Sequence, residues 1–139
     1  MKTTDSQPRF KFNTIGLFTT DNKATVDFYT KAFGFTTSWD GKQPNVELFL
    51  DNNRIILFPR KDFEKMTGQR FQYPTGFNGT MELSLDVPTF ADVDKEYQNA
   101  LQHGASTVLA PTTKPWGQRT CYVADPDGNL IEISSFKKQ

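Results

Sequence analysis

A chain of 139 residues with 16 basic and 16 acidic side chains fits one domain, and it carries no clustered Lys and Arg surface of the kind that binds nucleic acid. No apolar run approaches the about 18 residues of a membrane span, and the first residues lack the apolar stretch of a secretory leader. A single cysteine, Cys121, excludes an intrachain disulfide. The composition therefore predicts a cytoplasmic protein with no nucleic-acid or membrane partner.

The first half of the chain predicts one strand, one helix and three further strands. Residues 1–9 are polar and are expected to form a flexible segment. Val26, Tyr29 and Phe33 have the spacing of a helical stripe, and Gly34 follows as a helix stop. The predicted elements span residues 12–18, 24–33, 35–39, 46–50 and 54–58.

The second half repeats this order, with Leu17 recurring as Leu85 and Gly34 as Gly104. Its predicted elements span residues 81–87, 91–103, 106–109, 119–123 and 130–134. The sequence Asp-Pro-Asp-Gly at 125–128 is suited to the final turn. The pattern predicts an α+β fold of two βαβββ modules in tandem.

A long segment at residues 61–79 separates the two halves. Connections of this length tend to be lids, binding loops or linkers. Phe71, Tyr73 and other apolar residues make it unlike a disordered linker. We expect it to fold over a ligand cleft, or alternatively to pack on its own domain or on a partner subunit.

The module order and several short motifs together resemble the vicinal oxygen chelate superfamily, which holds glyoxalase I, bleomycin-resistance proteins, fosfomycin-resistance enzymes and extradiol dioxygenases. The motifs are TVDFY at 25–29, FGF at 33–35, WGQR at 116–119 and DPDGNLIEI at 125–133. The resemblance covers one domain at 10–136, with module one at about 10–60 and module two at about 80–136. It implies curved mixed sheets around a cup-like cleft, often completed by a second chain, so a homodimer is expected.

Many enzymes of this superfamily hold a divalent metal with His or Glu from the first and last strands of both modules. Carried over by motif, these positions fall on Glu132, Glu82, Thr14 and Leu57. None is a histidine, and the single histidine, His103, ends the second predicted helix. Two carboxylates alone are a poor site for zinc, nickel or ferrous iron. No cofactor is therefore expected, although Glu132 and Glu82 remain able to hold a hard ion such as Mg²⁺.

Glu132 and Glu82 are the candidates for chemistry. If both point into the cup, like-charge repulsion raises one pKa, and the pair can act as general acid and base. Alternatively, each faces solvent on a half-exposed sheet. Trp116 can stack on a ligand and Arg119 can pair with it, or Arg119 can pair with an acid on a neighbouring strand while Trp116 packs at a rim.

The resemblance and the missing metal ligands favour a small-molecule binding protein like the bleomycin-resistance members, without a transition metal. We expect Glu132 as the catalytic candidate and ligand contacts from Trp116, Arg119, Glu82, Phe71, Tyr73, Thr14 and Leu57. The alternative is a glyoxalase-like lyase or another superfamily enzyme that uses Glu132 as metal ligand or general base.

Overall fold

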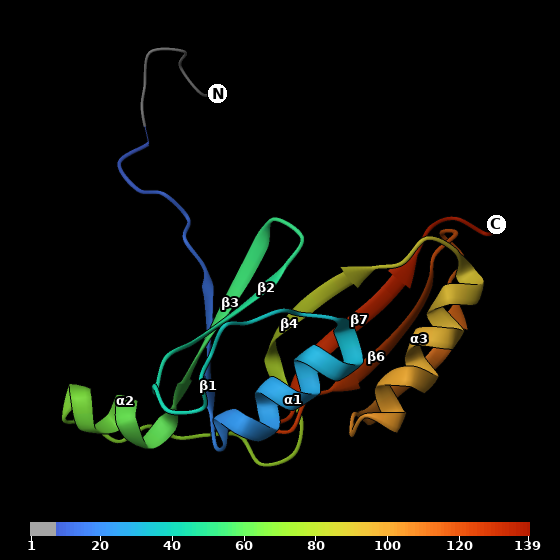
Figure 1. Ribbon diagram of the computed structural model, residues 1–139. Coiled ribbons are helices and arrows are strands. Elements are labelled where there is room, and N and C mark those ends of the chain that lie inside the picture. The colour runs from blue at the N-terminus through green and yellow to red at the C-terminus, as the bar shows by residue number, and fades with distance from the viewer. Residues whose placement is uncertain (1–7) are drawn as a thin grey trace.

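The computed structural model describes residues 8–139, so most of the segment expected to be flexible, residues 1–7, lies outside the described residues. Over these residues the chain forms seven strands and three helices, which confirms the α+β fold (Figure 1). The elements are β1 Ile15–Thr19, α1 Asn22–Phe33, β2 Val46–Leu50, β3 Asn53–Pro59, α2 Arg60–Thr67, β4 Asn78–Asp86, α3 Phe90–Gln102, β5 Ser106–Thr113, β6 Arg119–Ala124 and β7 Asn129–Ser135.

Two predicted elements are wrong. Residues 35–39 form no strand and contribute only a single bridge from Thr36 to Phe49. The hydroxyl of Thr37 accepts from the amide of Trp39, and Asp40 accepts from the amide of Lys42. Such local side-chain bonds compete with a strand ladder for the backbone groups.

The second error concerns the segment at 61–79, in which no helix was predicted. It contains α2, which starts after Pro59 and ends at Gly68 in the left-handed conformation, and it contains the first residues of β4. A proline at the start and a glycine at the end of this stretch are helix boundary signals. These two signals were missed because the segment was treated as one long connection.

The predicted helix stop at Gly34 is confirmed, and side chains cap the starts of α1 and α3. The side chain of Asp21 accepts from the amides of Lys23 and Ala24 at the start of α1, and Gly34 ends that helix with φ 76°. Thr89 and Asp92 form a reciprocal capping box at the start of α3.

The strands form two separate sheets. The first sheet has the order β1-β3-β2 and the second has β4-β7-β6-β5. In each, the module's first strand lies parallel to its last, with Leu17 paired to Leu57 and Leu85 paired to Ile133. The remaining pairs are antiparallel. The two modules are therefore built alike.

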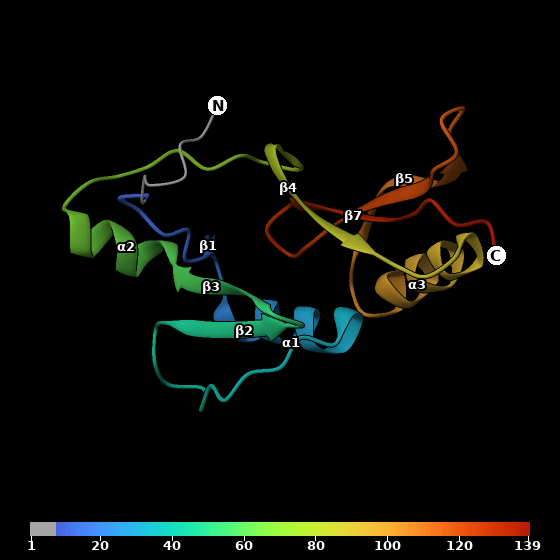
Figure 2. The same ribbon diagram turned by 90° about the horizontal axis from the view of Figure 1, so that it is seen from above.

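Helices α1 and α3 share one hydrophobic core with one face of each sheet (Figures 1 and 2). The core includes Tyr29, Leu48, Val93 and Ile131, all essentially inaccessible to solvent. The opposite face of each sheet, which we call its open face, points away from these two helices. Helix α2 approaches the open face of the first sheet, where Phe63 lies 4.2 Å from Phe18 between ring centroids.

The final turn joins the two modules. Asp125 is buried and accepts a hydrogen bond of 2.8 Å from the hydroxyl of Tyr29 in α1. Asp127 accepts from the backbone amide and hydroxyl of Thr20 in the first module. Burial, followed by the Asp125 carboxylate, raises the pKa of Tyr29 well above its usual value. Tyr29 therefore stays a donor at all ordinary pH values, and the Asp-Pro-Asp-Gly ending serves the fold.

Tyr29→Phe should lower the free energy of unfolding by about 1–2 kcal/mol, because it removes one buried bond to a charged acceptor while Asn129 still donates to Asp125. Chemical denaturation followed by circular dichroism measures the change. The matched control is Tyr73→Phe. The Tyr73 hydroxyl also donates to a carboxylate, that of Glu64 on α2, but this pair lies near the surface. Equal effects of the two substitutions would contradict the buried role of Tyr29.

No helix within residues 8–139 has both the length and the apolar character needed to cross a membrane.

Candidate functional site

Glu132 lies in the middle of β7 with its carboxylate on the open face of the second sheet. One oxygen accepts from the hydroxyl of Ser84 in β4 at 3.0 Å. The other accepts from the hydroxyl of Thr120 in β6 at 2.7 Å and from the side-chain amide of Gln118 at 3.3 Å. Because β4 and β6 flank β7, the carboxylate is held from both sides.

Trp116 is linked to this carboxylate through Gln118. The Trp116 indole nitrogen donates to the Gln118 side-chain oxygen at 2.8 Å, while the amide nitrogen of the same Gln118 reaches Glu132. The Trp116 side chain is 65% exposed. A large aromatic surface is thus positioned beside the carboxylate and is free to stack on a ligand.

Glu82 adds a second carboxylate to the same face and accepts from the hydroxyl of Tyr122 at 3.3 Å. Partial burial, followed by the negative charge of Glu132, raises the pKa of Glu82 above its usual value. Burial and the two carboxylates also raise the pKa of Tyr122 to about 12. We call Glu82, Ser84, Trp116, Gln118, Thr120, Tyr122 and Glu132 the Glu132 network.

The Glu132 network combines hydrogen-bond acceptors, hydroxyl donors and an exposed aromatic ring. Glu82 takes up a proton more readily than an ordinary glutamate, while Tyr122 remains protonated. The network can therefore hold a ligand by hydrogen bonds and stacking, and it can exchange a proton at Glu82.

The raised pKa of Glu82 predicts a dependence of stability on pH. Ionisation of Glu82 is disfavoured in the folded state, so its contribution is favourable below the usual glutamate pKa and is lost as pH rises through the raised value. Glu82→Gln should therefore stabilise the fold at neutral pH relative to the parent chain, with the difference vanishing in acid. Thermal unfolding of the parent chain and the variant, measured from acid to neutral pH, tests this. A difference that grows in acid would contradict it.

Arg119 lies on the other face of the second sheet, away from the Glu132 network. Its guanidinium pairs with both carboxylate oxygens of Asp94 in α3, each at 2.8 Å. The hydrogen bond from Arg119 lowers the pKa of Asp94. This bidentate pair ties α3 to its sheet. It matches the expectation that Arg119 pairs with an acid, except that the acid lies on a helix and not on a neighbouring strand.

Phe71 and Tyr73 lie against α2 and not against the Glu132 network. The Phe71 amide and the Tyr73 hydroxyl both donate to the Glu64 carboxylate, and these bonds lower the pKa of Glu64. The Phe71 ring lies 5.3 Å from that of Phe63, which in turn covers part of the open face of the first sheet. The segment thus folds back over the first sheet.

Thr14 and Leu57 were the predicted counterparts of the two glutamates in the first module. Thr14 lies just before β1, and its hydroxyl donates to the Arg54 carbonyl at 3.0 Å. Leu57 is fully buried in the core, on the helix-covered face of its sheet. The assignment of Leu57 to the cup is therefore wrong.

The strand register explains the error. Gly16 pairs with Ile56 in the first sheet in the same way that Ser84 pairs with Glu132 in the second. Ile56, one residue before Leu57, is therefore the counterpart of Glu132. A cleft of about 470 Å³ lies at this place on the first sheet, lined by Thr37, Ser38, Trp39, Gln43, Asn45, Glu47 and Ile56.

Four network members, Ser84, Gln118, Thr120 and Tyr122, were not predicted as site residues from the sequence. Thr120 and Tyr122 alternate along β6, with Gln118 two residues before Thr120, so these three side chains are expected on one face of the sheet. Alternation alone would have grouped them. Their contact with Glu132 needed the pairing of β6 with β7, which places Tyr122 opposite Glu132.

The residues at the superfamily's metal positions do not fit a transition metal. Glu82 and Glu132 supply oxygen, the Thr14 hydroxyl is already bonded to backbone, and Ile56 has no donor atom. Within the described part of the chain, no three His, Cys, Asp or Glu side chains lie close enough to share a metal. Zinc, nickel and ferrous iron sites usually draw on imidazole or thiolate.

Comparisons with known proteins agree with the fold. The sequence profile of the Glyoxalase/Bleomycin resistance protein/Dioxygenase superfamily matches residues 11–133. An uncharacterised protein of Mycobacterium bovis is 34% identical over 114 residues, which cover 78% of this chain and 72% of the relative. The uncharacterised protein YraH of Bacillus subtilis is 32% identical over 123 residues, covering 86% and 93%.

Among solved structures, a glyoxalase/bleomycin resistance protein/dioxygenase family enzyme from Burkholderia phytofirmans superposes with a TM-score of 0.76 at 26% identity. The superposition covers 88% of this chain and 95% of that one.

Proposed function

The chain belongs to the Glyoxalase/Bleomycin resistance protein/Dioxygenase superfamily, and from this we propose that it binds a small molecule, without a transition metal, at the open face of its second sheet. The Glu132 network is the recognition surface. Glu132 and Glu82 supply the polar contacts, and Trp116 supplies a stacking surface.

One observation carries the proposal: Trp116, Gln118 and Glu132 form a continuous hydrogen-bonded chain on an exposed sheet face. Here three side chains fix one carboxylate, so its position is set before any ligand arrives. Such preorganisation reduces the entropy lost on binding.

The opposite wall of the cup comes, in this proposal, from a second copy of the chain. Among the main element contacts within residues 8–139, only α3 packs on the second sheet, from its other face, and the open face of the first sheet exposes Phe18 and Phe49 at 39% and 41%. Exposed apolar side chains of this size favour an interface. The first sheet of the partner would bring its Ile56 cleft opposite Glu132, giving a symmetric homodimer.

The choice of a metal-free site rests on the donor set. When the open faces of two copies meet, Glu82 and Glu132 of one copy face Thr14 and Ile56 of the other. The Thr14 hydroxyl is already bonded to backbone, and Ile56 has no donor atom. This combination supplies no nitrogen or sulfur ligand. A hard ion such as Mg²⁺ would be held by the carboxylates Glu82 and Glu132 with water or substrate completing its shell.

Two measurements on untagged protein test the proposal. Plasma mass spectrometry should find no stoichiometric zinc, nickel, iron or manganese after dialysis, and a retained metal would overturn the metal-free claim. Thermal-shift screening of aromatic and antibiotic-like compounds should then yield stabilising ligands. Their effect should be lost in Trp116→Ala, which leaves folding unchanged because the side chain is largely exposed. Full retention of the effect would remove Trp116 from the site.

The second candidate function is a superfamily enzyme that uses Glu132 and Glu82 as base and acid. The raised pKa of Glu82 beside Glu132 favours it, because two carboxylates that titrate differently can divide these roles. Catalysis would be supported if the protein converts a bound ligand and both Glu132→Gln and Glu82→Gln abolish the conversion. The Glu82→Gln variant should still bind the ligand. Unchanged ligand after long incubation would support binding alone.

A further inference from the structure

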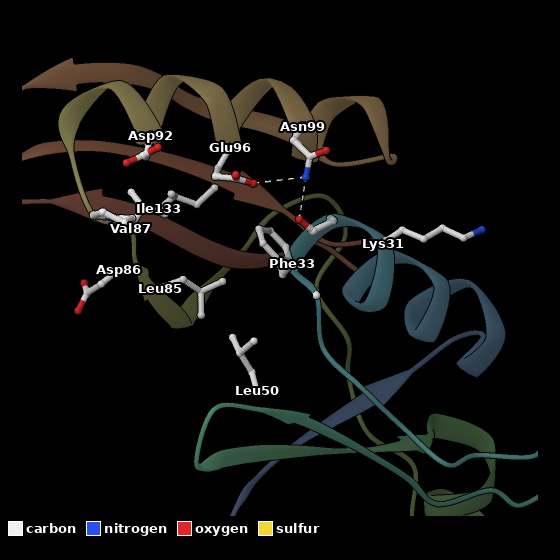
Figure 3. Close-up of a pocket in the computed structure, with 13 residues that line it drawn as sticks. Lys31, Phe33, Leu50, Leu85, Asp86, Val87, Asp92, Glu96, Asn99 and Ile133 are labelled. Atoms are coloured by element: carbon white, nitrogen blue, oxygen red, sulfur yellow. Dashed lines mark hydrogen bonds between the residues drawn. The ribbon is translucent and has the colours of Figure 1, made fainter.

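A separate groove of about 470 Å³ lies between the two modules, away from the Glu132 network (Figure 3). It is bounded by the end of α1, the end of β2, the end of β4 and the side of α3 that carries Asp92, Glu96 and Asn99. Phe33, Leu50, Leu85 and Val87 form its apolar wall, and all four are only half-buried. Figure 3 shows the apolar side chains of Leu50 and Leu85 directed toward one another across the groove.

The rim of this groove is acidic. Asp86, Asp92 and Glu96 line it, against a single cation, Lys31. Glu96 and Asp92 belong to α3, and Asp86 ends β4. An occupant that matches both wall and rim needs apolar side chains flanked by positive charge.

The chain itself carries such a segment immediately before β1, which we call the arm: residues Arg9, Phe10, Lys11 and Phe12. Phe10 and Phe12 are 78% and 86% exposed, among the most exposed apolar side chains of the protein. The Arg9 guanidinium lies over the Phe10 ring at 5.0 Å. The arm thus alternates two cations with two solvent-exposed aromatic rings.

The arm does not reach the groove of its own chain in this structure. Asn13 accepts from the Arg54 guanidinium at 2.7 Å, and Thr14 donates to the Arg54 carbonyl, so the arm leaves along the start of β3. Figure 1 shows this trace running away from α3 and the end of β4. The groove and the arm are therefore on different sides of one chain.

We propose that the arm of one chain docks in the inter-module groove of a second copy, with Phe10 and Phe12 on the apolar wall and Arg9 and Lys11 at the acidic rim. In a two-fold symmetric pair each copy gives its arm and receives the other, so the exchange closes at two chains. Charge complementarity sets the direction of the arm, and burial of the two rings supplies the attraction.

The area involved shows what the exchange can do. Aromatic side chains bury about 150–250 Å² each, so four phenylalanines in a symmetric pair contribute about 600–1,000 Å². Stable interfaces bury about 1,200–2,000 Å² in total. Arm exchange therefore strengthens a dimer that also uses another surface, and its loss weakens the dimer without abolishing it. The proposed cup does not depend on it.

Isotope-mixed photo-crosslinking tests the contact. The full chain is made with p-benzoylphenylalanine in place of Phe12, once unlabelled and once ¹⁵N-labelled, and equal amounts are mixed and irradiated. We expect crosslinks between the arm and groove peptides from residues 83–99, with light–heavy pairs present. Crosslinks that join only peptides of the same label, light to light or heavy to heavy, would overturn the proposal. Crosslinks from the arm to other surfaces would also overturn it.

Charge reversal tests the energetics by sedimentation equilibrium. Lys11→Glu and Glu96→Lys should each raise the dimer dissociation constant about tenfold, and the double variant should restore it. Phe10→Ser with Phe12→Ser should weaken it at least as much, whereas Met66→Ser, at an apolar residue that is 67% exposed and lies outside the arm and the groove, should not. A monomeric parent chain, or a double variant weaker than either single one, would contradict arm exchange.

Discussion

Glu132→Gln is expected to weaken small-molecule binding by about 10- to 100-fold, while the free energy of unfolding changes by less than about 1 kcal/mol. The charged acceptor that Ser84, Thr120 and Gln118 hold in place is replaced by a neutral amide of the same shape. Calorimetric titration with a ligand from the thermal-shift screen measures the affinity, and chemical denaturation measures the stability.

The same substitution has a readout that needs no ligand. Glu132 contributes to the raised pKa of Glu82, so removing its charge should return the pKa of Glu82 toward the ordinary glutamate value. Side-chain carboxyl NMR across a pH titration measures this. Glu64→Gln is the matched control, because the Glu64 carboxylate is likewise held by hydrogen bonds, two in number, but lies on α2. Affinity lost equally in both variants would place the effect outside the Glu132 network.

Gly128→Ala is expected to lower the free energy of unfolding by about 3 kcal/mol, through a strained backbone and a steric clash. Gly128 has φ +87°, and a Cβ there would lie 2.0 Å from the backbone carbonyl oxygen of Gly76. That backbone cannot retreat freely, because the Asn78 amide donates to the Gly128 carbonyl at 2.8 Å. Denaturation followed by circular dichroism measures the loss.

Gly41→Ala separates the two causes. Gly41 has nearly the same backbone angle, φ +89°, but a Cβ there meets no atom within 4 Å. It should therefore cost only the conformational strain, about 1–2 kcal/mol. If both variants lose the same stability, the close approach between the inter-module segment and the final turn is not what makes Gly128 necessary.

The elements that the sequence predicted well are those with local signals. Helix α1 is set by the Asp21 cap, the apolar stripe and the Gly34 stop, all within 14 residues of chain by the printed sequence. The ending at 125–133 also identified the superfamily, which the sequence profile confirms. The strand expected at 35–39 failed because its local side-chain bonds satisfy the backbone without a ladder.

The candidate site was partly predictable for a similar reason. Glu132, Glu82 and Trp116 were singled out from motif position and residue type, and the structure brings them to one face. For Arg119 the sequence left a ligand contact and an ion pair both open, and the structure shows an ion pair with Asp94, 25 residues away in α3. Leu57 was misplaced by one residue, which in a strand exchanges one face for the other. Both outcomes depend on contacts between elements that are distant in the sequence, which a local pattern does not reveal.

The most direct test of the central claim is to map a bound ligand onto the protein by NMR. A ligand found by thermal shift is titrated into ¹⁵N-labelled protein at concentrations that span saturation. We expect the largest shifts at the Trp116 indole, the Gln118 side chain and the amides of Ser84 and Tyr122, with loss of saturation in Glu132→Gln. Shifts confined to the inter-module groove or to α2, for every ligand that binds, would contradict a binding site at the Glu132 network.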